Sequence, residues 1–298
     1  LKPGKAMYGS LSFEDWALRP SSSMSAIDRI GGRLELKNRK IRFKETSAQI
    51  GGQRVQGEGW IDFELSDDPK WDIEIKGEKI PLFRTTDMII RSDVDLRAIH
   101  TNREKSPLLR GDLRLRSSTL LVDIDPLAPR VKSGPGRQPP FFSVDHPFFK
   151  DWRLDLSIQG DSFMRVRSPY FKTELSTDLS LRETLAAPLL TGWVRLIDGE
   201  VRFPGANMNI EQGEIFILEE EPDKLQLDIS GVSQTASYVI TMEISQSLER
   251  PQVQLESSPS LSNAAIMRLL TTGSTTGGGV GAVGMYLGQG MLGPGGMD

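Results

Sequence analysis

The chain has 298 residues, with 36 Lys and Arg against 40 Asp and Glu, and its net charge of −4 excludes the strongly basic surface typical of nucleic-acid-binding proteins. It contains no cysteine and only two histidines, which excludes disulfide frameworks, thiolate zinc sites, cysteine nucleophiles and histidine-rich metal centres. We therefore predict neither a metal nor a cofactor. The chain begins at Leu1. It has no signal-peptide pattern and no apolar run of about 18 residues, so we expect a piece of a longer protein whose anchor lies elsewhere.

Strict alternation of apolar and polar residues dominates the chain. In chain order, the clearest alternating segments are 60–65, 71–76, 152–157, 225–230 and 238–244. Because successive side chains of a strand point to opposite faces, each segment is predicted to be a strand with one apolar and one polar face. Strands of this kind form antiparallel sheets that are wet on one side. The pattern predicts an all-β fold.

A similar five-residue pattern recurs at 32–36, 111–115 and 192–196, each time beginning with glycine. The three glycines lie 79 and 81 residues apart. A period of this length indicates one unit of several short strands used repeatedly. We expect roughly fifteen strands in an elongated, curled, repeat-built antiparallel sheet, because so long a sheet must curl or pair with another sheet to cover its apolar face.

Two segments interrupt this pattern. Six prolines fall within 126–147, flanked by phenylalanines, and predict a long loop inserted into the second repeat. The stretch 273–298 is dense in glycine and uncharged until its last residue, so it is predicted to be a flexible tail, with contact to a membrane or partner as the alternative. We divide the chain into a β-repeat region at 1–125, the insertion at 126–150, a second β-region at 151–272 and the tail.

One short helix is predicted near the C-terminal end. Residues 262–270 start with Ser262 and Asn263, both good N-cap residues, and Gly273 follows just beyond the end. This is the clearest helical segment of the chain.

The apolar strand faces are the candidate functional surface. Such a face either lines an open groove for acyl chains or belongs to a filled core, and alternation alone does not distinguish the two. The candidates are Ile61, Phe63, Trp71, Ile73, Ile75, Leu154, Leu156, Ile158, Leu227, Ile229, Tyr238, Ile240, Met242 and Ile244.

An ordered set of blocks occupies the last third of the chain. The blocks are 189–205, 213–216, 225–230 and a Ser-Ser-Pro-Ser-Leu-Ser run at 257–262 that leads into the helix. Through these residues the chain, from 161 to 270, resembles the C-terminal region of the TamB family, the translocation and assembly module proteins of the bacterial envelope. The resemblance implies a curled β-sheet that forms a taco-like hydrophobic groove of lipid width.

The resemblance also implies a location and partners. Members of the family are anchored in the inner membrane, cross the periplasm and meet an outer-membrane barrel protein of the BamA/TamA type. The implied activity is passive transport of phospholipid acyl chains between membranes, assistance to outer-membrane protein assembly, or both. No nucleic acid, catalytic residue or metal is implied.

Two other classes remain open from the residues. An extracellular binding or adhesive domain would pack the same apolar faces into closed β-sandwiches. A glycosidase or calcium site would use carboxylates such as Asp123 and Asp125, or the run 219–221, which solvated turn and strand positions explain more simply. His100 and His146 have no nucleophile-elbow motif beside them, so we expect no enzyme.

Overall fold

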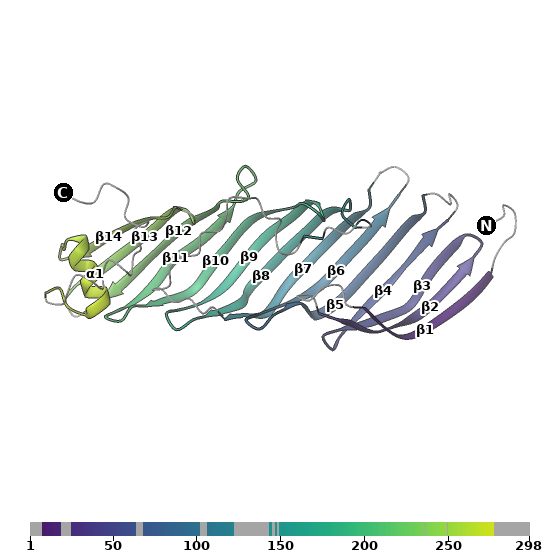
Figure 1. Cartoon of the computed structure of the whole chain (residues 1–298), viewed down its shortest axis with the longest axis horizontal. Coiled ribbons are helices and arrows are strands. Elements are labelled where there is room, and N and C mark those ends of the chain that lie inside the picture. Colours follow the sequence, from purple (N-terminus) through teal and green to yellow (C-terminus); the bar gives the residue numbers. More distant parts are fainter. Residues whose placement is uncertain are drawn as a thin grey trace. The chain divides into compact units, whose positions relative to one another are not determined.

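The computed structural model describes residues 8–18, 25–63, 68–101, 106–121, 143–144, 147, 149–235, 237–248 and 250–276. Strands follow one another along this part of the chain, and one helix ends it (Figure 1). The elements are β1 (Tyr8–Leu18), β2 (Ile27–Lys37), β3 (Lys40–Ile50), β4 (Gln53–Asp62), β5 (Lys70–Arg84), β6 (Met88–His100), β7 (Leu108–Leu121), β8 (Arg153–Arg167), β9 (Phe171–Thr184), β10 (Pro188–Arg202), β11 (Asn207–Ile217), β12 (Leu225–Gln234), β13 (Val239–Ser247), β14 (Gln252–Ser258) and α1 (Asn263–Thr272).

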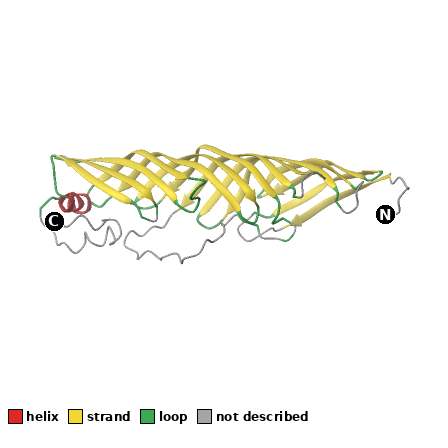
Figure 2. Ribbon diagram, turned by 90° about the horizontal axis from the view of Figure 1, so that it is seen from above, coloured by secondary structure: helices red, strands yellow, loops and turns green. Residues whose placement is uncertain are grey.

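The described strands form one sheet of 14 strands, ordered in space as they are in the sequence. Neighbouring strands run antiparallel, as in the ladders β4–β5 and β12–β13, and the sheet does not close on itself. Strands and helix can be followed in Figure 2. The prediction of an all-β, open antiparallel sheet with a short C-terminal helix is confirmed. The alternative of two packed sheets is not found among the described residues.

Segments 71–76 and 225–230 lie inside longer strands, whereas 152–157 and 238–244 each begin one residue before β8 and β13. Segment 60–65 passes the end of β4 at Asp62, and its last two residues lie outside the described residues. Segment 71–76 is part of β5, which has 15 residues, because a β-bulge continues the strand where the alternation breaks. At this bulge the register shifts between Gly77 and Ile80, and Lys79 has a φ of 53°. Similar non-glycine residues with positive φ occur in other strands, among them Glu45 in β3 and Ser162 in β8.

Polar side chains of neighbouring strands bind the amides that the bulges expose. The Lys79 amide donates a hydrogen bond to Oδ1 of Asp93, at 2.9 Å, and Arg116 Nε donates to Oδ2 of the same carboxylate at 2.8 Å. The Ser162 amide donates to Oγ of Ser176 at 2.9 Å. These hydrogen bonds give amides at the interrupted parts of the ladder a partner, and so they stabilise the local backbone conformation.

The chain divides into two compact units, which we describe separately. The first, unit 1, comprises Leu1–Thr119, Gln138–Asp161 and Asp178–Leu190. The second, unit 2, comprises Leu120–Arg137, Ser162–Thr177 and Thr191–Asp298, and it contains α1. The predicted insertion and the glycine-rich tail lie largely outside the described residues.

Of the three repeated glycines, Gly32 and Gly111 lie where a neighbouring backbone passes close. Gly32, Gly111 and Gly192 lie in β2, β7 and β10, so the near-constant sequence spacing does not correspond to a constant number of described strands. At Gly111 the φ is 140°, and a Cβ would lie 2.1 Å from the carbonyl oxygen of Asp95. Only glycine fits such a position without moving the neighbouring strand.

The Asp93 contacts predict an acid-sensitive step in stability. Partial burial raises the pKa of Asp93, but the Lys79 amide and Arg116 outweigh it and hold the pKa below its ordinary value of 3.8. A carboxylate with a lowered folded-state pKa stabilises the fold above its unfolded-state pKa, and this stabilisation is lost as the pH falls through the folded-state value. We expect the free energy of unfolding to fall below about pH 4 in the wild type, and to start lower and fall less steeply in Asp93→Asn.

Urea unfolding followed by tryptophan fluorescence at pH 7, 5 and 3.5 measures both slopes. Asp112→Asn, at an exposed position of β7, is the matched control and should follow the wild type. Equal pH dependence in Asp93→Asn and wild type would show that the carboxylate does not support the bulge.

Candidate functional site

In unit 1 the strand register gathers apolar side chains on one face of the sheet. Directly opposite residues in an antiparallel pair share a face, and Ile61 lies opposite both Ile41 and Trp71. One step along the strands, Gly59 lies opposite Phe43 and Ile73. The set, here called the unit 1 apolar face, consists of Leu34, Leu36, Ile41, Phe43, Ile61, Trp71, Ile73, Ile75, Leu96 and Ala98.

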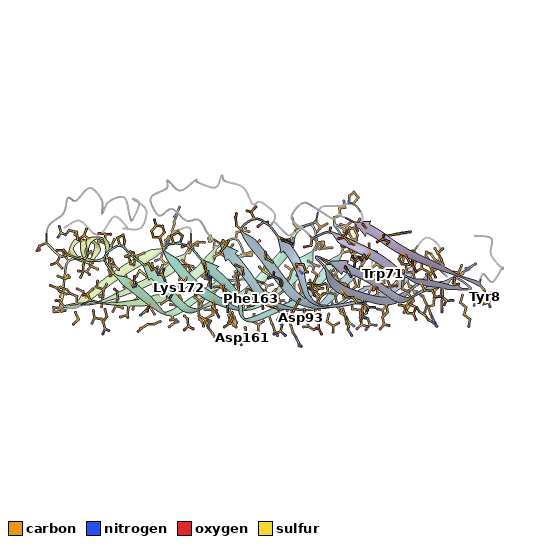
Figure 3. All side chains as sticks on the ribbon, turned by 90° about the horizontal axis from the view of Figure 1, so that it is seen from below. Tyr8, Trp71, Asp93, Asp161, Phe163 and Lys172 are labelled. Carbon is orange, nitrogen blue, oxygen red and sulfur yellow. The ribbon has the colours of Figure 1, made fainter. Side chains whose placement is uncertain are left out.

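The opposite face of the same strands is polar and crossed by ion pairs. Arg97 of β6 donates from Nε to Asp72 of β5 at 2.7 Å, and Lys44 lies 2.8 Å from Glu35 across β2 and β3. The hydrogen bond from Arg97 lowers the pKa of Asp72 and holds it ionised. Trp71 and Asp93, labelled in Figure 3, project from opposite faces. The polar face remains in water, so the apolar face is the one available for an apolar ligand.

The unit 1 apolar face is not closed over by another described element. Every described strand of unit 1 belongs to the sheet itself, and the described residues of unit 1 contain no helix that could cover it. Ile61, Trp71, Ile73 and Ile75 are accordingly only partly buried, and Phe63, just beyond β4, is partly buried as well. Five of the fourteen predicted residues thus lie on or beside a face with remaining solvent exposure.

A second group of predicted residues in unit 1 lies in a small core. Leu154 and Leu156 of β8 are 5% and 6% exposed and cluster with Leu181 of β9. Ile158 and Leu190 are packed against this cluster and are partly buried. These side chains support the sheet, and Leu154 also reaches the cleft described below.

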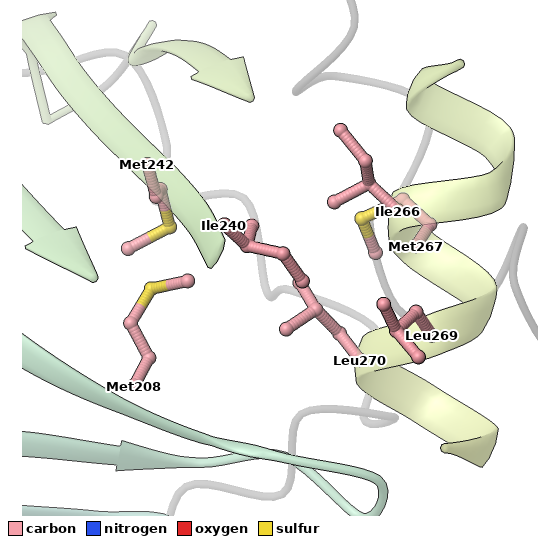
Figure 4. Close-up of a cluster of buried hydrophobic side chains, with 7 residues drawn as sticks. All are labelled: Met208, Ile240, Met242, Ile266, Met267, Leu269 and Leu270. Carbon is pink, nitrogen blue, oxygen red and sulfur yellow. The ribbon is translucent and has the colours of Figure 1, made fainter. Parts of the chain in front are cut away.

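In unit 2 the corresponding apolar face is covered by α1. Met208, Ile240 and Met242 from the sheet contact Ile266, Met267, Leu269 and Leu270 from the helix, as Figure 4 shows. Ile240 and Ile266 are fully buried and Leu270 is 1% exposed. Of the predicted residues, Ile240 and Met242 therefore belong to a helix-covered core, against which Tyr238 and Ile244 are packed. Leu227 is 8% exposed and Ile229 is partly buried.

Two caps and one close contact hold α1 in place. Ser262 accepts a hydrogen bond from the Ala265 amide, and Gly273 ends the helix with a φ of 76°, as the sequence predicts. The Gly205 amide, in the turn between β10 and β11, donates to the Leu270 carbonyl at 2.8 Å. A Cβ at Gly205 would lie 2.2 Å from the Gly273 amide nitrogen, so the turn and the helix end fit only with glycine there.

A cleft of about 890 Å³ lies in unit 1 where several strands begin or end. Trp71, His100 and Trp152 form its aromatic wall, and Arg153 and Arg182 are among its charged lining residues. Sequence reasoning missed this cleft, because its residues come from β5, β6, β8 and β9 and have no common motif. The one signal in the sequence was a tryptophan at the start of two alternating segments.

The catalytic and metal candidates are not assembled into a reactive site in the described part of the chain. His100 Nε2 lies 2.6 Å from Asp68 Oδ1, and the His100 ring lies tilted against that of Trp71, with centroids 5.9 Å apart. Glu219, Glu220 and Glu221 are exposed in the turn between β11 and β12, while Asp123, Asp125 and His146 lie outside the described residues. Among the residues that the structure describes, no group of three or more His, Cys, Asp or Glu side chains could hold a metal ion. Within the same residues, no helix has the length and apolarity needed to span a membrane.

Fold and surface together define an all-β protein built on one open amphipathic sheet. The family model for the TamB C-terminal domain matches residues 44–296, and the chain therefore belongs to the TamB family. This match extends the resemblance seen at 161–270 over most of the chain. The family is an envelope-associated transport and assembly module and not an enzyme family. No curated protein matches the chain.

The helix-covered core of unit 2 gives a stability prediction. Leu270→Ala removes a side chain that is 1% exposed and leaves a cavity between α1 and β13, so we expect the free energy of unfolding to fall by about 2–5 kcal/mol. Chemical denaturation followed by circular dichroism measures the change. Leu248→Ala, at a position 52% exposed, is the control and should change stability by about 0.5 kcal/mol at most. Similar losses in the two variants would contradict a helix-covered core.

Proposed function

We propose that this protein binds lipid acyl chains along the unit 1 apolar face and takes part in passive lipid transport between the two membranes of the envelope. The observation that carries the proposal is the partly exposed apolar face itself, which five strands build in register. Burying apolar area against such a face contributes about 25 cal/mol per Å², or about 0.8 kcal/mol per methylene group of an acyl chain. A chain of ordinary lipid length therefore gains enough free energy to leave water.

The mechanism needs no energy source within this chain. Apolar side chains attract methylene groups without direction, so an acyl chain can shift along Phe43, Ile73 and their neighbours without breaking specific bonds. The polar face carries the ion pairs that keep the sheet soluble on its other side. Lipid would then move down its own concentration gradient between a donor and an acceptor membrane.

Family membership supports a location and partners for this activity. We place the protein in the periplasm, as part of a longer chain anchored in the inner membrane, with an outer-membrane barrel protein of the BamA/TamA type as its partner. Phospholipid acyl chains are its proposed cargo.

Assistance to outer-membrane protein assembly is the second candidate function, and one observation favours it. β14 is an edge strand of the open sheet, with its second edge unpaired within the described residues. An edge strand offers a row of amide and carbonyl groups to which a further strand can be added. A barrel protein with an open strand is a partner of suitable chemistry.

Native mass spectrometry of protein purified without detergent tests the lipid proposal. We expect co-purifying phospholipid, and we expect Ile73→Asp to reduce its occupancy about tenfold, because a carboxylate on the apolar face must be desolvated by the acyl chain. Ile73 suits this test since Gly59 lies opposite it and leaves room for the carboxylate.

Val239→Asp is the matched control, because it places the same charge on the polar face of β13 at a position 37% exposed. It should retain lipid. If the wild type carries no lipid, or both variants lose it equally, the apolar face is not the binding surface. Ile240→Asp is unsuitable, since that side chain is fully buried under α1 and its replacement would disrupt the core.

A further inference from the structure

The polar face of the hairpin formed by β2 and β3 carries an excess of positive charge. Alternate residues of the two strands point to this face, and the ladder sets them in pairs across the hairpin. Asp62 of β4 and Lys70 of β5 continue the row of the ladder that contains Lys40. The charged set, here called the basic patch, comprises Arg33, Lys37, Lys40, Arg42, Lys44 and Lys70 with the carboxylates Glu35 and Asp62. Six cations against two carboxylates leave the patch with a net charge of +4.

Two ladder pairs of the hairpin place like charges directly opposite each other. Arg33 lies opposite Lys44, and Lys37 lies opposite Lys40. Like charges at directly opposite positions of an antiparallel pair are destabilising, whereas opposite charges there are favourable. The hairpin therefore retains a repulsion that an anion bound at this face would relieve.

Carboxylates within the patch neutralise only part of this charge. Lys44 pairs with Glu35 at 2.8 Å, and its hydrogen bond, together with the charges of Arg33 and Arg42, lowers the pKa of Glu35. Arg33, Lys37 and Arg42 are exposed, and they form no ion pair with another described residue. These three cations are therefore available to an external anion.

Two aromatic rings lie on the same polar face, beside the cations. Trp60 of β4 lies opposite Arg42, and Nζ of Lys40 lies 3.7 Å from the centroid of the Trp60 ring. Tyr8 of β1 lies opposite Lys37 and is 68% exposed. Tryptophan and tyrosine suit the boundary between water and hydrocarbon, because one part of each side chain is apolar and another forms hydrogen bonds. Rings among cations fit an anionic bilayer better than an acidic peptide, which has no hydrocarbon layer to receive them.

The positive charge gathers at the margin of the sheet where the hairpin turns (Figure 1). Further from this margin the polar face becomes acidic, because Glu58 of β4 lies opposite Glu74 of β5. Asp72, between these two regions, is paired with Arg97. A negatively charged surface is therefore attracted to the margin and repelled further along the same strands.

The unit 1 apolar face begins at the same margin. The Phe63 amide donates a hydrogen bond to the carbonyl of Arg39, in the hairpin turn, at 2.9 Å. Ile61 and Trp71 are opposite each other in the row of the ladder next to Asp62 and Lys70. A bilayer bound to the basic patch would thus lie beside the end of the apolar face, where an acyl chain has a short path between the two.

We infer that the basic patch docks unit 1 onto the surface of a membrane that contains anionic phospholipids. Phosphate groups of several lipids bind the exposed guanidinium and ammonium groups, and the rings of Trp60 and Tyr8 enter the headgroup layer. This inference goes beyond acyl-chain binding, because it gives the polar face a partner of its own.

Flotation with lipid vesicles tests the docking. One set of vesicles contains phosphatidylcholine alone, and the other contains equal parts of phosphatidylcholine and phosphatidylglycerol. We expect the wild type to bind the anionic vesicles about tenfold more tightly at low salt, and to lose most of this preference in about 0.5 M sodium chloride.

The double variant Lys37→Gln/Lys40→Gln tests the patch itself. It should weaken binding to the anionic vesicles about fivefold for each charge removed. Its free energy of unfolding should not fall, because the substitutions remove a like-charge pair. Arg110→Gln/Arg114→Gln removes the same charge from exposed positions of β7 outside the patch, and as the matched control it should bind these vesicles like the wild type.

The outcomes separate docking from acyl-chain binding. If the wild type binds both kinds of vesicle equally, or the two double variants lose affinity equally, the docking surface is wrong, while the co-purified phospholipid still reports acyl-chain binding. If the lysine variant loses stability along with vesicle binding, the lysines act on the fold and the inference fails. If poly-L-glutamate binds the wild type as tightly as the anionic vesicles do, the patch recognises acidic chains in general and the membrane assignment is wrong.

Discussion

Separation of apolar and polar side chains onto the two faces of one open sheet is the constraint on which the rest of the structure depends. A strand exposes alternate side chains to opposite sides, and antiparallel pairing carries the separation from strand to strand only while the register is kept. Ile61 opposite Trp71, and Asp72 opposite Ile99 on the other face, belong to neighbouring steps of this register. A slip by one residue would place charges on the apolar face. The ion pairs between Arg97 and Asp72, or Arg195 and Glu214, therefore fix the same alignment that the apolar residues require.

The β-bulges extend this constraint along strands that are too long for simple alternation. A bulge inserts an extra residue and increases the local twist, so that a long strand follows a bending sheet. Asp93 and Ser176 bind the amides of the positive-φ residues Lys79 and Ser162 from the neighbouring strand. Buried polar side chains of this sheet thus bind the backbone: Ser118 Oγ accepts a hydrogen bond from the Arg91 amide, and Ser92 Oγ donates one to the Asp93 carbonyl.

The two units differ in whether a described element covers their apolar side chains. In unit 2 the helix α1 supplies its own apolar side chains to the face, so Met208 and Ile240 have no accessible surface left. In unit 1 the described elements leave the face partly accessible and set an aromatic, charged cleft at its margin. The acyl-chain binding proposed above would use the accessible apolar face of unit 1 and leave its polar face in water.

Alternation in the sequence by itself determined the all-β class and the face of each side chain within segments such as 71–76 and 225–230. Capping residues determined the helix between Ser262 and Gly273. These properties depend on neighbours close in sequence, which a local pattern contains. The lengths of the strands were underestimated, because positive-φ residues such as Lys79 and Asp198 interrupt the period of two without ending the strand. Only the tertiary structure decided which apolar residues remain accessible. Ile73 and Ile240 both lie in segments of alternating apolar and polar residues, yet α1 covers Ile240 and not Ile73. The cleft likewise depends on strand ends from Trp71 to Arg182 meeting at one margin, and no spacing along the chain encodes that meeting.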